Sequence, residues 1–152
     1  NTSKVNATIA NQLALYLTMY SPLQMAADFP EHYEQFADAF QFIKDVAVDW
    51  QKSKYLLAEP GDYIVVARKA KKTGKWFAGG VTDENSRTLD VPMNFLDPGK
   101  TYVAKIYADA SDADYQKNPQ AYVINEQEVT SESVLPIFMA RGGGFAIEFS
   151  EK

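Results

Sequence analysis

The spacing of apolar residues changes about one third of the way along the chain. Before residue 50, apolar residues recur at intervals of three and four, the spacing of one face of a helix. Two stripes share this spacing: Ile9, Leu13, Tyr16, Leu17 and Tyr20, and then Tyr33, Phe36, Ala37, Phe40 and Ile43 to about Val46. Between them, Ser21 followed by Pro22 and Gln24 is typical of a helix start. The pattern predicts helices in residues 1–50.

After residue 50 the pattern becomes short alternating runs bounded by turn residues, which is typical of β-strands. The predicted strands are 55–58, 63–70, 76–81, 88–91, 102–107, 122–130, 134–139 and 145–149. Residues 71–74 indicate a hairpin tip, and Asp97-Pro98-Gly99 a turn, because proline presets φ and glycine accepts a positive φ. About eight strands at this spacing predict an antiparallel β-sandwich in residues 51–152, and so an α+β chain.

Glycine and charge divide the chain at the same place. The first fifty residues contain no glycine, and all eight glycines lie between Gly61 and Gly144. Glycine is unfavourable inside helices and common in turns, so its distribution supports helices followed by strands. Residues 1–50 hold six acids and two bases, a net charge of −4, whereas residues 51–152 hold fourteen acids and thirteen bases, a net charge of −1.

Whole-chain composition excludes several classes of protein. The chain has 152 residues, of which 46% are hydrophobic and 23% charged, and this is enough for a dry core. A net charge of −5 disfavours nucleic acid or an anionic membrane as partner. No apolar run reaches the roughly 18 residues of a membrane span. The absence of cysteine excludes disulfides, thiolate zinc sites and thiol nucleophiles.

The first predicted helix is apolar on nearly all sides from Leu13 to Tyr20. Such a helix is normally buried on several faces. It could pack on one face of the sandwich, or its neighbours could belong to a larger domain upstream, and the pattern favours the second alternative. The chain begins at Asn1 and its earliest methionine is Met19, so we expect a processed chain or a part of a longer protein.

Candidate catalytic residues are few. The only histidine, His32, lies in an acidic stretch at a helix start, where a solvated side chain is the favoured interpretation over a catalytic base. Glu126 and Glu128 share one face of a predicted strand, at roughly the 6–7 Å used by inverting glycosidases. Their neighbours Asn125 and Gln127 are polar and would not raise a carboxyl pKa, so we expect a solvated strand edge.

Two loops and one aromatic group could bind ligands. Asp109, Asp112 and Asp114 offer oxygen ligands for calcium, but the order of an EF-hand is absent and an ordinary polar loop is favoured. The segment 142–144 is three glycines followed by a predicted strand rather than a helix, which favours a tight connection over a phosphate loop.

The aromatic group could form a sugar-stacking platform, although strand aromatics more often belong to a core. Its members are Trp76, Phe77, Tyr102 and Tyr107. The residues by themselves assign no reaction, no catalytic residue, no cofactor-binding residue and no metal ligand.

Several stretches, in matching order and nearly end to end, resemble the C-terminal end of glycoside hydrolase family 97, a bacterial family of α-glucosidases and α-galactosidases. These stretches begin with Gln12-Leu13-Ala14-Leu15-Tyr16 and run on to Asp28, followed by Phe42-Ile43-Lys44-Asp45-Val46, Asp49-Trp50, Gly61-Asp62-Tyr63, Trp76-Phe77-Ala78-Gly79-Gly80, Asp112-Ala113-Asp114-Tyr115 and Gly142-Gly143-Gly144-Phe145. Within the family, the closer likeness is to calcium-dependent, inverting α-glucosidases.

The resemblance implies an architecture and a partner. Residues 1–50 would be the closing helices of an upstream (β/α)8 catalytic barrel, and residues 51–152 the C-terminal β-sandwich. The catalytic and calcium-binding glutamates of the family lie upstream, so none is assigned to a residue of this chain. The parent enzyme would bind calcium, cleave α-linked oligosaccharides and reside in the periplasm. This part would support the barrel and contribute to subunit contacts in a homo-oligomer.

Two other classes remain open. An autonomous carbohydrate-binding module would need Trp76 and Tyr107 exposed on one face. A protein-interaction sandwich with a helical appendage would need a partner. The residues that would separate glucoside from galactoside preference, or inversion from retention, are not in this chain.

Overall fold

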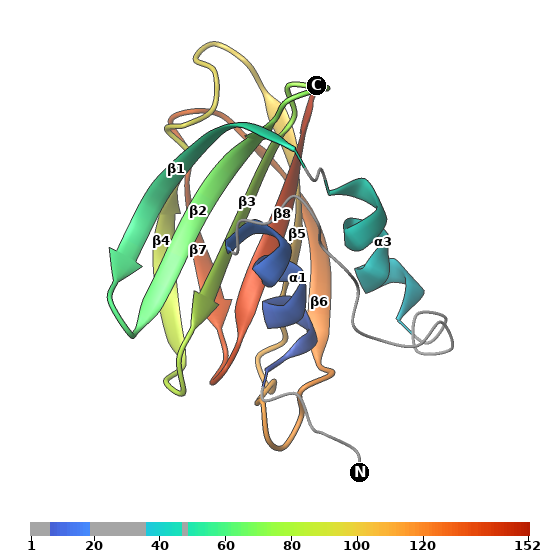
Figure 1. Ribbon diagram of the computed structural model, residues 1–152, viewed down its shortest axis with the longest axis vertical. Coiled ribbons are helices and arrows are strands. Elements are labelled where there is room, and N and C mark those ends of the chain that lie inside the picture. Colours follow the sequence, from blue (N-terminus) through green and yellow to red (C-terminus); the bar gives the residue numbers. More distant parts are fainter. Residues whose placement is uncertain (1–6, 19–35, 47–48) are drawn as a thin grey trace.

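The computed structural model describes residues 7–18, 36–46 and 49–152, which form two helices followed by eight strands (Figure 1). The helices are α1 (Ile9–Thr18) and α3 (Ala37–Asp45). The strands are β1 (Trp50–Glu59), β2 (Tyr63–Ala70), β3 (Trp76–Thr82), β4 (Arg87–Pro92), β5 (Tyr102–Asp109), β6 (Tyr122–Val129), β7 (Val134–Met139) and β8 (Gly144–Glu151). The predicted sequence of helices and then about eight antiparallel strands is confirmed. Neither described helix is long and apolar enough to cross a membrane.

The strands form one large and one small antiparallel sheet. The large sheet has six strands in the order β1-β2-β3-β8-β5-β6, and the small sheet pairs β4 with β7. Figure 1 shows α1 lying across one face of the large sheet, with β4 and β7 on the opposite side. The large sheet is therefore the middle of three layers.

One hydrophobic core fills the space between the two sheets. Alternate residues of the large sheet point into it, for example Phe145, Ile147 and Phe149 of β8. The small sheet contributes residues such as Leu135 and Ile137. This is the sandwich core that the alternating strand pattern predicts.

A second core lies on the other face of the large sheet, beneath the helices. Leu13 and Leu17 of α1 and Phe42 of α3 are fully buried there against Phe77 and Tyr107 of the sheet. Phe42 makes edge-on ring contacts with both aromatic residues, at centroid distances of 6.1 and 5.3 Å. Of the two alternatives for the apolar first helix, packing on one face of the sandwich accounts for its buried side.

Several predicted boundaries change in the structure. β1 begins at Trp50, five residues before the predicted start, because its first half is exposed and polar and therefore gives no apolar alternation. The hairpin at 71–74 and the turn at Gly99 are confirmed, with φ values of +70° at Gly74 and +79° at Gly99. The helix start predicted at Ser21 and the candidate base His32 lie outside the described residues.

A close contact between α1 and the sheet is made possible by a glycine. A Cβ added at Gly79 of β3 would lie 2.9 Å from Leu17 Cδ1 and 3.2 Å from Leu17 Cβ. Two fully buried alanines, Ala14 on α1 and Ala146 on β8, belong to the same layer of small residues. Small side chains on both surfaces allow the helix backbone to approach the sheet.

We expect Gly79→Val to lower the free energy of unfolding by about 1–3 kcal/mol, because the added methyl groups would overlap Leu17. Urea denaturation measures this cost. The same substitution made in a Leu17→Ala background should cost less, since the overlapping side chain is gone. Equal costs in the two backgrounds would contradict the close approach.

Candidate functional site at the junction of helix and sandwich

The four aromatic residues that could have formed a sugar-stacking platform are core residues, which is the interpretation that the sequence favours. Trp76 and Tyr102 are 4% and 5% exposed and belong to the core between the sheets. Phe77 and Tyr107, each 1% exposed, belong to the core on the helix side. Because neighbouring strand residues point to opposite faces, the four rings divide between two dry interiors. They cannot stack on a sugar.

The predicted carboxylate pair is a solvated edge, as expected. Glu126 and Glu128 are exposed on β6, the last strand of the large sheet. Glu126 lies opposite Lys105, and Glu128 forms an ion pair with Lys152. No apolar enclosure surrounds them, so the structure gives this pair no feature of a catalytic acid and base.

The three aspartates of the candidate calcium loop have separate roles. Asp114 accepts hydrogen bonds from the backbone N–H groups of Gln116 (2.8 Å) and Lys117 (3.1 Å), and these bonds lower its pKa. Asp112 accepts a bond from the amide of Asn118. Within the described part of the chain, no three histidine or acidic side chains are arranged to hold a metal ion.

Asp109 is the exception, since it is buried and not part of a loop. It is 4% exposed at the end of β5, and its Oδ2 accepts hydrogen bonds from Ala140 N and Gly144 N, both at 2.9 Å. Burial raises the pKa of Asp109 from its ordinary value of 3.8, while hydrogen bonds from the Thr8 side chain and from these two backbone groups act in the opposite direction. The carboxylate thus organises the connection between β7 and β8.

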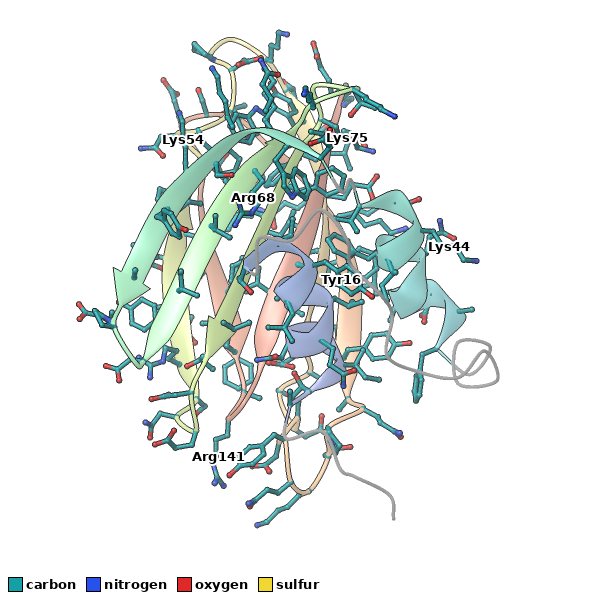
Figure 2. The ribbon with its side chains drawn as sticks, viewed as in Figure 1. Tyr16, Lys44, Lys54, Arg68, Lys75 and Arg141 are labelled. Carbon is teal, nitrogen blue, oxygen red and sulfur yellow. The ribbon has the colours of Figure 1, made fainter. Side chains whose placement is uncertain are left out.

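That connection contains the three glycines, and the prediction of a tight connection is confirmed. Gly142 has a φ of +63°, and a Cβ at Gly143 would lie 1.9 Å from Asp109 Oδ2. Only glycine therefore fits beside the buried carboxylate. Figure 2 places Arg141 at this end of the molecule, where its Nη1 lies 3.3 Å from Asp114 Oδ2.

The N-terminal end of α1 is bound to the same connection. Thr8 caps the helix by accepting a bond from Asn11 N (3.1 Å), and its own N–H donates to Gly142 O (3.2 Å). The Asn11 side chain donates to Gly143 O at 2.9 Å. Ile9 N donates to Pro119 O at 2.9 Å. Carbonyl groups of the sandwich thus satisfy the N–H groups of Thr8 and Ile9, and the Thr8 side chain satisfies that of Asn11.

The C-terminal end of α1 is held by Arg68 of β2. This side chain is 4% exposed; its Nε donates to Leu17 O, and its Nη1 donates to Ser53 Oγ at 2.6 Å. A guanidinium at a helix C-terminus complements both the unpaired carbonyls and the negative end of the helix dipole. Figure 2 shows Arg68 beside that end of α1.

Sequence reasoning missed the functions of Asp109, Arg68 and Asn11. The only signal for Arg68 was a charged residue inside the apolar run 63–70, and for Asp109 a carboxylate at a strand end. Their partners, Leu17 and Ala140, are distant in sequence. The arrangement attaches α1 at both ends and along its side, so it serves to join a helix rigidly to a sandwich.

Removing the charge of Asp109 should change how stability depends on pH. The folded state binds this proton more tightly than the unfolded chain, so between pH 3.8 and the raised pKa the group makes the folded state less stable as pH rises. We expect the difference in unfolding free energy, wild type minus Asp109→Asn, to fall through that window in urea titrations at several pH values.

Thr8→Val is the matched variant for this titration. This variant retains the Asp109 carboxylate but loses the Thr8 hydrogen bond that lowers the pKa of Asp109. The fall of stability with rising pH should therefore remain and extend to higher pH. Parallel profiles for the wild type and Asp109→Asn would contradict the assignment.

Arg68→Met keeps the apolar length of the side chain but removes its donors. We expect it to lower the free energy of unfolding by about 1.5–3 kcal/mol and to speed amide exchange in the last turn of α1. Ser53→Ala removes the bond to the strand only, so it should cost about 0.5–1.5 kcal/mol without affecting α1. Equal exchange rates in α1 for both variants would be evidence against the cap.

Comparison with known proteins gives consistent matches. The family described as "Glycosyl-hydrolase 97 C-terminal, oligomerisation" matches residues 49–150. A solved Glycoside Hydrolase Family 97 enzyme from Pseudoalteromonas sp. strain K8, in complex with acarbose, is 46% identical with a TM-score of 0.94, and the match covers 97% of this chain and 23% of that chain.

Two other relatives extend the comparison. A retaining alpha-galactosidase from Bacteroides thetaiotaomicron is 33% identical over 141 residues, covering 93% of this chain and 20% of that protein. A beta-arabinopyranosidase structure shares the fold, with a TM-score of 0.76 at 18% identity, over 95% of this chain and 21% of that chain. The chain therefore spans about a fifth of the length of the relatives it matches.

Proposed function

Since this chain belongs to glycoside hydrolase family 97, whose C-terminal oligomerisation region it matches, we propose that it is the non-catalytic support of an enzyme that cleaves α-glycosides. The observation that carries the proposal is the three-point attachment of α1 to the sandwich, through Asp109 and Asn11 at one end, Arg68 at the other and Gly79 along its side. This attachment would keep the sandwich in a fixed position relative to a domain that packs against the other side of α1.

The outer side of α1 supports the same proposal. Leu15 is only half-buried, although its side chain is large and apolar. The relatives are about four to five times longer than this chain, and the upstream catalytic barrel is the partner that we propose for this side. The helix would then be shared between barrel and sandwich, with residues 1–50 closing the barrel.

The chemistry belongs to the upstream part in this proposal. A carboxylic acid would protonate the glycosidic oxygen and a carboxylate would act on the opposite side of the sugar. Calcium is proposed for that part as well. The donors described in this chain do not suit the ion, because Asp109 is used by backbone N–H groups and Asp114 by its own turn.

For the substrate of the parent enzyme we propose an α-glucoside. The 46%-identical enzyme has been solved with acarbose and with panose, both of which contain α-linked glucose. The 33%-identical relative is named an alpha-galactosidase, so the identities favour glucose over galactose. An autonomous sugar-binding module is not favoured, because Trp76 and Tyr107 are buried on opposite faces.

The test is an assay of the purified 152-residue chain. We expect no turnover of aryl α-glucosides or aryl α-galactosides, with or without added calcium. The intact parent enzyme should hydrolyse the glucoside faster than the galactoside and lose activity in a chelator. Turnover by the isolated chain would contradict the non-catalytic assignment, and a parent without glycosidase activity would contradict the proposed reaction.

A further inference from the structure

The two edges of the large sheet differ in how well they are protected against a further strand. β1, at one edge, has two irregularities in its pairing with β2, between Trp50 and Lys52 and between Tyr55 and Leu57, and it carries exposed lysines. Bulges and lysines are the usual devices that prevent edge strands from pairing. β1 is therefore a poor template for another strand.

β6, at the opposite edge, lacks these devices. It pairs with β5 over eight consecutive residues without a register shift, and it contains neither proline nor lysine. Five of these residues are exposed, including Val123 at 40%. Figure 1 shows β6 at the margin of the sheet, with the first turn of α3 near the start of the strand. An edge strand that is exposed, regularly paired and free of basic residues is suited to accept a further strand.

The outward backbone groups of β6 can be identified from its pairing with β5. Ala110 N donates to Ala121 O, so the odd-numbered residues of this strand direct their N–H and C=O groups towards β5. The backbone N–H and C=O groups of the even-numbered residues point outward from the edge of the sheet. These residues are Tyr122, Ile124, Glu126 and Glu128. Among the described residues, no backbone hydrogen bond outside the sheet ladders uses these outward groups.

We propose that β6 of one copy pairs antiparallel with β6 of a second copy about a two-fold axis through Asn125. This inference goes beyond the proposed function: the matched family is described by oligomerisation, and the inference names a surface and a register for it. The two large sheets would become one continuous sheet across the dimer.

The register follows from complementarity. With Asn125 opposite Asn125 of the second copy, Ile124 faces Glu126 and Tyr122 faces Glu128, so every outward residue has an outward partner. No glutamate lies opposite a glutamate. A shift by two residues in one direction would place Glu126 opposite Glu126 of the second copy, and directly opposed like charges are destabilising. A shift in the other direction would leave outward backbone groups without partners.

α3 is compatible with the pairing. It contacts Tyr122 through side chains, with Phe36 packing edge-on at 6.3 Å and Asp38 accepting a bond from the Tyr122 hydroxyl. Burial and this bond raise the pKa of Tyr122 to about 12, so the hydroxyl stays protonated and donates at neutral pH. Both contacts are made by side chains, so neither uses an outward backbone group of β6.

A proline substitution tests the edge. Glu126→Pro removes one outward N–H without removing a bond to β5, and proline is tolerated on an edge strand when its nitrogen faces away from the sheet. Glu126→Thr removes the same carboxylate and keeps the N–H. In sedimentation equilibrium of the 152-residue chain, we expect the wild type and Glu126→Thr to dimerise, and Glu126→Pro to show a dissociation constant at least about tenfold higher.

Single cysteines test the register, because the chain has no cysteine of its own. Across the axis, residue 125 would face its own copy at a Cα separation of about 4.5–5.5 Å, within the range of a disulfide. Residue 127 would be about 13 Å from its own copy, given roughly 3.3 Å per residue. Asn125→Cys should therefore cross-link two chains under mild oxidation, and Gln127→Cys should not.

The proposal is overturned if the wild-type chain is monomeric at high concentration, if Glu126→Pro associates as well as Glu126→Thr, or if both cysteine variants cross-link equally. Circular dichroism of each variant confirms that the monomers are folded. None of these outcomes affects the proposed function, because glycosidase activity is measured separately.

Discussion

The structure depends on one constraint: the six-stranded sheet is apolar on both faces. An antiparallel sheet usually buries one face and exposes the other to water. Here β2 and β8 alternate between two cores, with Val65 and Ile147 on the side of the small sheet and Val66 and Ala146 on the side of the helices. A two-stranded sheet covers the first face only. The second face needs α1 and α3, so the helices belong to the same folded unit as the sandwich.

The polar contacts of α1 determine where the helix lies on that face. Apolar packing is not directional, whereas the bonds from Asn11 and Thr8 to the glycine connection, and from Arg68 to Leu17, fix the position of the helix along its axis. The buried carboxylate of Asp109 holds the connection to which the helix is bound. In the proposed function, a helix fixed in this way would transmit the position of the sandwich to the upstream barrel.

Much of the fold could be predicted from local pattern, and the junction could not. Strands 63–70 and 134–139 were predicted with the bounds that the structure has, because alternation and turn residues are local signals. Local pattern assigns Asp109 to an ordinary polar loop and cannot tell which of two interiors buries Trp76, since nothing local shows that a helix or a second sheet covers them. Arg68 and Leu17 are 51 residues apart, and only the fold brings them together.

The central claim is that α1 and the large sheet unfold as one unit. Native-state hydrogen exchange of the 152-residue chain tests it most directly, by comparing the amides of Leu13 and Leu17 with those of Val66 and Ala146. The account predicts the same opening free energy for helix and sheet, equal to that of global unfolding. Exchange of the helix amides through a separate opening of much lower free energy, while the sheet stays protected, would contradict it.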